Sequence, residues 1–294
     1  MRRLLAVCCA AVLALTGCVS NPNRGLSRTT LENRAKMKEK MPSYQILEGN
    51  LGVSGEGFIF ENERFRFEFK KELTEVDGYR TEEDRRARGL KASKELNSSY
   101  EFVRKLFGVE APRTIRVVIQ EKWPSPSTPA YVSWSSVEGI VMYFGVDSFQ
   151  DNSILAHEMA HALISRFQIP TWLNEGIATL VEVDHAKSKR GDMKLPSPLL
   201  LDQNGYNAVQ TWRSHEAEGS EYSEIAMYRA SYSVVTDALR RFGNDIFLKF
   251  FQQLDAEKRE RRELTMREII QRIDRATGRQ DAQAFFEELK FRIE

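Results

Sequence analysis

Two histidines four residues apart, with a glutamate directly after the first, are the residues of this chain best suited to chemistry. They are His157, Glu158 and His161. On a helix, positions i and i+4 lie on one face, roughly 5–6 Å apart at Cβ, so two imidazole nitrogens can reach one metal ion. Glu158 lies about 100° further around the axis, where its carboxylate can act as a base on water without binding the metal. The pattern predicts two zinc ligands and a general base, and the alternative is a helix with two solvent-facing histidines.

This motif needs a helix, and its neighbours favour one over residues 152–167. Asp151, Asn152 or Ser153 can cap the start, because short polar side chains accept hydrogen bonds from the first N–H groups of a helix. No proline or glycine occurs from Ile154 to Gln168. Four apolar residues at helical spacing supply a buried face: Leu155, Met159, Ala162 and Leu163.

A catalytic zinc site with two histidines needs a third ligand, often a carboxylate, and leaves the fourth position to water. Glu175 lies 14 residues beyond His161, in a second predicted helix over residues 171–183 that begins just after Pro170. Three side chains near the end of that helix are alternatives: Glu182, Asp184 and His185. They lie roughly 10 Å or more further along the helix axis, which favours Glu175. His185 and His215 are otherwise expected at the surface.

The segment AHEMAHAL…IPTWLNEGIATLVE, residues 156–182, resembles the gluzincin branch of the zincin peptidases. It is most similar to the peptidase-MA-like domains of bacterial envelope proteins, and the order of elements over residues 115–243 is also similar. A metzincin would instead need glycine at 164 and histidine at 167, where this chain has Ile164 and Phe167. The resemblance implies a zinc metallopeptidase with Zn²⁺ as cofactor, and it assigns the third ligand to Glu175.

The resemblance also implies a tyrosine that stabilises the oxyanion, in a helix after the ligand segment. Tyr228 is the first choice and Tyr232 the second, although both have the spacing of helical core residues. Asn174 and Thr179 are candidates to hydrogen-bond the ligating histidines. A threonine at 179, where some gluzincins carry a carboxylate, departs from the family pattern. The implied substrate is a peptide or protein, which could add to an edge strand within residues 131–144 through backbone hydrogen bonds.

The N-terminus has the pattern of an export signal. A basic start, Met1–Arg3, precedes the apolar run Leu4–Leu15, which is too short to span a bilayer. The sequence Leu15-Thr16-Gly17-Cys18 resembles a bacterial lipobox, which implies cleavage before Cys18 and acylation of that cysteine. We therefore expect a lipid-anchored protein of the cell envelope, and Val19 favours the outer membrane facing the periplasm. The alternative is a plain secretory signal in which Cys18 is incidental.

Composition excludes some classes of partner. The chain has 294 residues, 43 basic and 42 acidic, so no excess of positive charge points to nucleic acid. At 41% hydrophobic and 29% charged residues, it has the composition of a folded protein with a full core. The sequence gives no indication of oligomeric state.

The expected organisation is a signal peptide at 1–17, a polar tether at 18–48 and a peptidase domain at 49–294. The domain should be α+β with a zincin-like fold, in which a small mixed sheet packs on the motif helix. A sheet-containing lobe would extend to about residue 184, followed by a mostly helical lobe over 185–294. Strands are expected at 63–70, 114–120, 131–134 and 139–144, with one more just before the first. Helices are expected at 81–107, 152–167, 171–183, 222–242, 244–254, 265–277 and 280–292.

A second function fits the same sequence. A zincin-fold lipoprotein could be catalytically inactive and act as a binding or scaffolding module, with its metal structural or lost. Glu158 argues against this alternative, because a purely structural site needs no base.

Overall fold

A computed structural model describes residues 58–121, 130–135, 138–190, 208–212, 224–257 and 262–293. The predicted signal peptide, tether and Cys18 lie outside these residues. The chain divides into two compact units, Met1–Asn97 with Ala111–Glu158, and Ser98–Glu110 with Met159–Glu294. The predicted division into a sheet-containing lobe to about residue 184 and a helical lobe over 185–294 stays a prediction.

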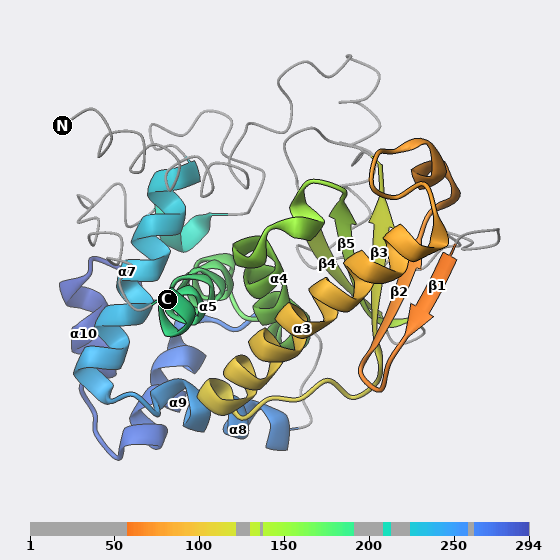
Figure 1. Ribbon diagram of the computed structural model, residues 1–294. Coiled ribbons are helices and arrows are strands. Elements are labelled where there is room, and N and C mark those ends of the chain that lie inside the picture. Colours follow the sequence, from red (N-terminus) through yellow and green to blue (C-terminus); the bar gives the residue numbers. More distant parts are fainter. Residues whose placement is uncertain are drawn as a thin grey trace, which may run out of the picture. The chain divides into compact units, whose positions relative to one another are not determined.

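The sheet has five strands in the order β1-β2-β3-β5-β4, with β1 and β4 at its edges (Figure 1). The strands are β1 (Phe58–Glu61), β2 (Phe65–Phe69), β3 (Ile115–Gln120), β4 (Ala130–Ser135) and β5 (Gly139–Gly145). β2, β3 and β5 run parallel to one another, while each edge strand is antiparallel to its neighbour. The predicted strands are confirmed, and the sheet is mixed, as expected.

Alternation along β2 explains its place in the sheet. Phe65, Phe67 and Phe69 point to one face and are fully buried. On the other face, Glu68 accepts two parallel hydrogen bonds from Arg116 of β3, at 2.9 and 3.0 Å. Burial alone would raise the pKa of Glu68, but the hydrogen bonds and charge of Arg116 outweigh it and hold the pKa below 4.5.

The long helix α3 (Glu82–Phe107) follows the β1–β2 hairpin and a 3-10 turn, Lys71–Glu75. Thr81 and Asp84 cap its start reciprocally, since each backbone N–H donates to the other's side chain at 3.1 and 3.0 Å. The hairpin is tied to α3 where Asn62 donates to Ser93 at 2.6 Å. The helix predicted at 81–107 is confirmed.

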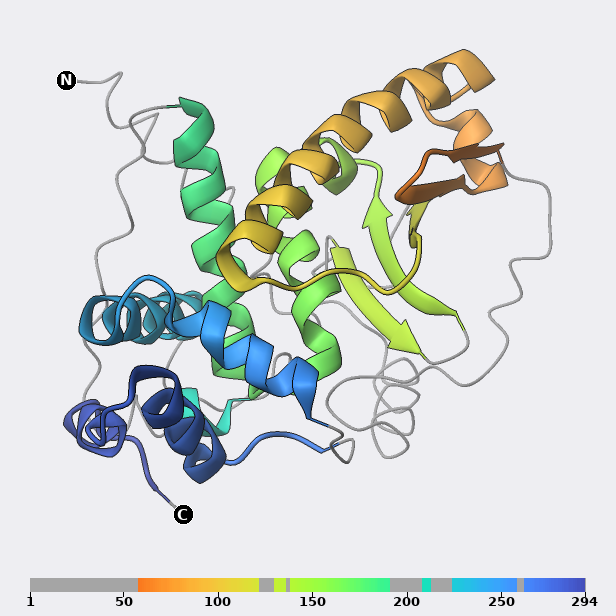
Figure 2. The same cartoon turned by 90° about the horizontal axis from the view of Figure 1, so that it is seen from below.

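Later in the described part of the chain lie α4 (Asn152–Ile164), α5 (Thr171–Arg190), α7 (Glu224–Phe242), α8 (Ile246–Ala256), α9 (Met266–Thr277) and α10 (Ala282–Glu288). Figure 2 shows the helices of the last part of the chain, in blue, grouped together. α7 packs along α5, α9 packs on α8, and α10 packs on α9. The predicted helices are all present, but the last ends at 288 rather than 292, because Lys290 adopts a left-handed conformation with φ 63°. The mixture of a small sheet with mostly helical structure agrees with the predicted α+β class.

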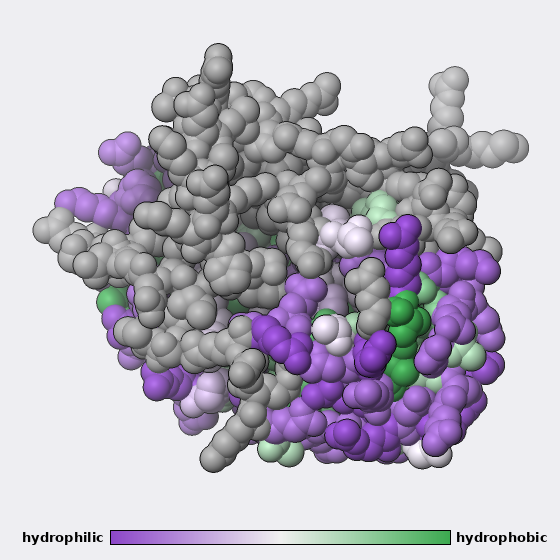
Figure 3. All heavy atoms as spheres, turned by 180° about the vertical axis from the view of Figure 1, so that it is seen from behind, coloured by the Kyte–Doolittle hydropathy of each residue, from purple (hydrophilic) through white to green (hydrophobic). Residues whose placement is uncertain are grey.

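The described surface is mostly polar. On the face seen in Figure 3, the described residues are mostly hydrophilic, with small hydrophobic groups between them. Among the described residues, the large hydrophobic side chains that stand exposed are Ile59 and Leu90. None of the described helices combines the length and apolar character that crossing a membrane requires.

Candidate metal centre

Helix α4 carries the two histidines in the protein interior. Asp151 caps the helix, because its Oδ1 accepts hydrogen bonds from the backbone N–H groups of Ser153 at 2.8 Å and Ile154 at 3.5 Å. His157 is 4% exposed and His161 is 9% exposed. The alternative of two solvent-facing histidines is therefore wrong, since every residue of α4 from Ile154 to Ile164 is buried.

A tight turn brings the second helix back toward the first. A 3-10 turn, Ser165–Phe167, ends at Gln168, which has left-handed angles of φ 52° and ψ 52°. The Gln168 carbonyl accepts a hydrogen bond from the backbone N–H of Leu264 at 3.0 Å. The Pro170 carbonyl then accepts from the N–H groups of Leu173 and Asn174, both at 3.0 Å, so that α5 begins directly after the proline. This turn orients the start of α5, which carries Glu175.

The structure brings the three predicted ligands together. One ligand atom from each of His157, His161 and Glu175 lies within 4.8 Å of the other two. His161 Nε2 is 3.3 Å from Glu175 Oε2. Two ligands of a tetrahedral zinc with bonds of about 2.05 Å are about 3.3 Å apart, so this pair already has the separation that zinc requires. The donor set of two imidazoles and a carboxylate also fits a divalent transition metal.

Asn174 fixes the orientation of His161. Its Oδ1 lies 3.2 Å from His161 Nδ1, which assigns the ring proton to Nδ1 and leaves the Nε2 lone pair for a metal. Asn174 is thus one of the predicted histidine partners that the structure confirms. Thr179, the other candidate, is buried one turn after Glu175 on the same helix.

The predicted base and the other two histidines have different positions. Glu158, the predicted base, is 4% exposed and directly follows His157 on α4. His185, which we expected at the surface or as an alternative ligand, is buried at 3% exposure. Its Nε2 lies 3.0 Å from Ser98 Oγ, and its ring packs on Phe102 of α3 at 5.5 Å. Its role is to join α3 to α5, which its place near the end of a predicted helix did not reveal. His215 lies outside the described residues.

Gly176, which sequence reasoning did not single out, permits a close helix crossing beside Glu175. A Cβ at this position would lie 2.5 Å from the Ser231 backbone oxygen and 2.7 Å from Val235 Cγ2, both on α7. Only glycine allows two backbones to approach so closely. A glycine in the middle of a predicted helix, where it costs roughly 1 kcal/mol relative to alanine, was the available signal.

The two tyrosine candidates have different surroundings on α7. Tyr232 is 2% exposed, and its hydroxyl has no hydrogen-bond partner among the described residues. Burial, together with the nearby Asp184 carboxylate, raises the pKa of Tyr232 well above its ordinary value of 10. Tyr228 is half-buried, and its ring packs edge-to-face on Trp212 at 5.0 Å. Tyr232 therefore has the environment of a core residue, whereas Tyr228 is the more accessible of the two.

No protein-family model matches this chain, and no curated protein sequence is significantly similar to it.

Proposed function

We propose that this protein is a zinc metallopeptidase of the gluzincin type, with a zincin-like fold in which the small mixed sheet packs on the motif helix. The observation that carries the proposal is the convergence of His157, His161 and Glu175, whose ligand atoms lie within 4.8 Å of one another, with the buried Glu158 next to His157 on α4. A purely structural zinc site is usually closed by four protein ligands, whereas three ligands leave one position for chemistry.

Each side chain has a distinct role in hydrolysis of a peptide bond. The neutral imidazoles and the Glu175 carboxylate would hold the ion, and zinc supplies the Lewis acidity that makes water a nucleophile near neutral pH. Glu158 accepts the proton of the attacking water and then delivers it to the leaving amine.

Tyr228 is the candidate to stabilise the oxyanion. Ser231 and Val235, which touch Gly176, belong to the stripe of α7 that faces α5. Tyr228 is three residues before Ser231 on that stripe, about 4.5 Å further along α7. Tyr232 lies one turn after Tyr228, about 40° from it around α7, and is close to Asp184.

The sheet offers a means of holding an extended substrate. β4 is an edge strand, hydrogen-bonded to β5 on one side only among the described strands. A peptide in extended conformation can add to such an edge through main-chain hydrogen bonds, which are independent of its sequence. We propose that substrate peptides bind along β4.

The variant Glu158→Gln tests the proposal against the inactive scaffold. Glutamine has nearly the same shape but cannot accept the proton, so a peptidase should keep its zinc and lose its turnover by at least about 100-fold. Cleavage of unfolded protein and of purified cell-wall peptides, followed by mass spectrometry, measures this loss and separates the two substrate classes. If zinc-loaded wild type cleaves neither substrate, and the variant replaces it fully in the cell, the scaffold function is correct.

We further propose that the protein acts in the cell envelope, attached through a lipid on Cys18. The lipobox sequence ending at Cys18 supports this location. Mass spectrometry of the protein from membranes should find an acylated N-terminal cysteine. Cys18→Ser should release the protein from the membrane fraction or block its processing, and a protein that begins elsewhere would contradict the anchor.

A further inference from the structure

The chain after α10 is directed toward the helix that carries Glu175. α10 ends in a Schellman motif, in which Lys290 N–H donates to the Glu287 carbonyl and Phe291 N–H to the Phe286 carbonyl, both at 2.9 Å. This motif needs a left-handed residue, usually glycine, but here Lys290 adopts φ 63°. A strained lysine persists only where surrounding contacts hold it in place.

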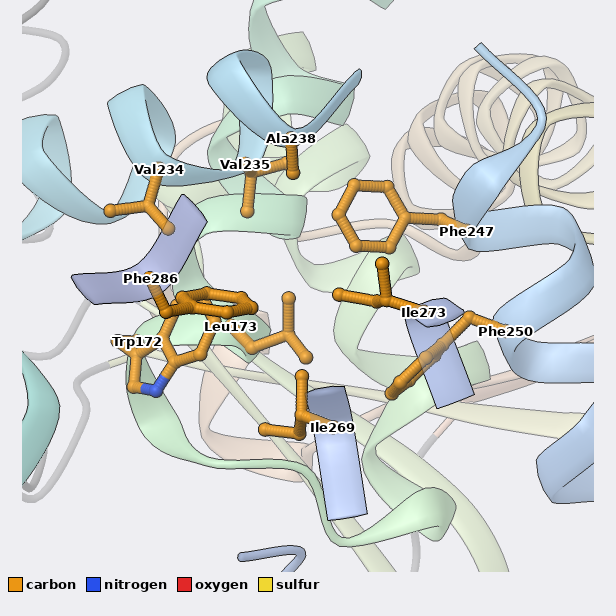
Figure 4. A pocket seen from close by; sticks show the side chains of 10 residues that line it. All are labelled: Trp172, Leu173, Val234, Val235, Ala238, Phe247, Phe250, Ile269, Ile273 and Phe286. Carbon is orange, nitrogen blue, oxygen red and sulfur yellow. The ribbon is translucent and has the colours of Figure 1, made fainter. Parts of the chain in front are cut away.

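Phe291 supplies the first of those contacts. It is 4% exposed, and its ring packs edge-to-face on Trp172 at 5.1 Å and on Phe286 at 5.5 Å. Trp172 lies in the first turn of α5, three residues before Glu175. Figure 4 shows Trp172 and Leu173 at the edge of a small apolar cavity, with Phe286 beside the indole. Because that side is not fully filled, the position of Trp172 depends on the two phenylalanine rings.

Arg292 supplies the second contact through its backbone. Its N–H donates to Gln210 Oε1 and its carbonyl accepts from Gln210 Nε2, both at 2.6 Å. Gln210 lies two residues before Trp212, whose indole packs on Tyr228 of α7. The same short segment is therefore linked to α5 on one side and to the support of Tyr228 on the other.

We infer that residues 290–292 form a brace that positions the first turn of α5, and with it Glu175, for metal binding. The part of this inference that concerns metal affinity rests on the proposed zinc site. Phe291 and Gln210 are positioning residues: they touch neither metal nor substrate and act through Trp172 and Trp212. Without the brace, Trp172 would shift toward the cavity. The Glu175 carboxylate would then move away from His157 and His161.

The test compares Phe291→Ala with Phe285→Ala in the full-length protein. Phe285 is also buried on α10, but its ring packs on Phe242 and Phe286 rather than on Trp172. Two quantities are measured at a temperature where all variants are folded. One is hydrogen exchange of the Leu173 and Asn174 amides in metal-free protein, and the other is zinc affinity by competition with a chelator.

We expect Phe291→Ala to speed exchange at both amides and to weaken zinc binding by about tenfold or more, as loss of a ligand's support does. Phe291→Leu, which keeps an apolar contact, should restore most of the affinity, and Phe285→Ala should change neither quantity. If Phe291→Ala does not fold, Gln210→Ala removes the Arg292 bonds at a half-buried position and should weaken zinc in the same direction.

Equal effects of Phe285→Ala and Phe291→Ala would overturn the brace, because they would indicate a general loss of stability. The brace is also overturned if neither Phe291→Ala nor Gln210→Ala changes amide exchange or zinc affinity. If wild type binds no zinc, the proposed function fails, and the exchange of Leu173 and Asn174 alone decides whether residues 290–292 position α5.

Discussion

Replacing Gly176 by alanine would place a methyl carbon 2.5 Å from the Ser231 backbone oxygen and 2.8 Å from its carbonyl carbon. A side chain could rotate away, but a backbone group moves only if α7 moves. Overpacking of this kind costs typically 1–3 kcal/mol, and contact with backbone puts this case near the upper end. Alanine regains roughly 1 kcal/mol in helix propensity. The net loss should be about 1–2 kcal/mol of the free energy of unfolding.

The shift of α5 against α7 should also weaken metal binding, because Glu175 directly precedes Gly176. We expect Gly176→Ala to weaken zinc binding by about tenfold, as measured by chelator competition in folded protein. Urea denaturation gives the stability. Ser231→Ala is the control: it removes a buried hydroxyl that has no partner among the described residues and leaves the backbone oxygen in place. Its stability should equal or slightly exceed that of wild type. If Gly176→Ala is as stable as wild type and binds zinc equally well, the close crossing does not position Glu175.

Three further outcomes follow from local geometry. Gln168→Gly should stabilise the protein by about 0.5–1 kcal/mol in urea denaturation, because glycine relieves the left-handed strain, whereas Gln168→Val should destabilise it. Asn174→Ala should weaken zinc binding by about 10–100-fold, because His161 loses its orienting partner, and unchanged affinity would contradict that role. Hydrogen bonds, above all from Arg262, lower the pKa of Glu268 from 4.5 to about 2. The ionised carboxylate therefore stabilises the fold fully above pH 4.5 and loses this effect as the pH falls toward 2, so wild type should lose stability more steeply over that range than Glu268→Gln.

The grouping of His157, His161 and Glu175 was the part of the structure best predicted from sequence, because it depends mainly on local spacing. The spacing of His157 and His161 fixes their common face once a helix forms, and the capping residue and absence of helix breakers predict that helix. Glu175 required one further element, and Pro170 marked where that element begins. The alternation of Phe65, Phe67 and Phe69 likewise predicted β2 from a few residues.

Features that depend on distant contacts were not predicted. The burial of His185 depends on Ser98, 87 residues earlier in the chain, and on Phe102 of the same helix. The early end of α10 depends on a lysine in a conformation that favours glycine, which no local propensity indicates. A glycine inside a predicted helix marks position 176 as unusual, but the reason for it appears only when α7 is placed against α5, because the clash would be with the backbone of Ser231.

The central claim is that His157, His161 and Glu175 hold one zinc ion and leave Glu158 free to act as a base. The most direct measurement is the zinc content of purified wild type, Glu158→Gln and Glu175→Ala after saturation with Zn²⁺ and removal of loosely bound metal. We predict about one zinc per chain in wild type and in Glu158→Gln, and far less in Glu175→Ala, which lacks one of three protein ligands. No zinc in the wild type, or full retention in Glu175→Ala, would contradict the account.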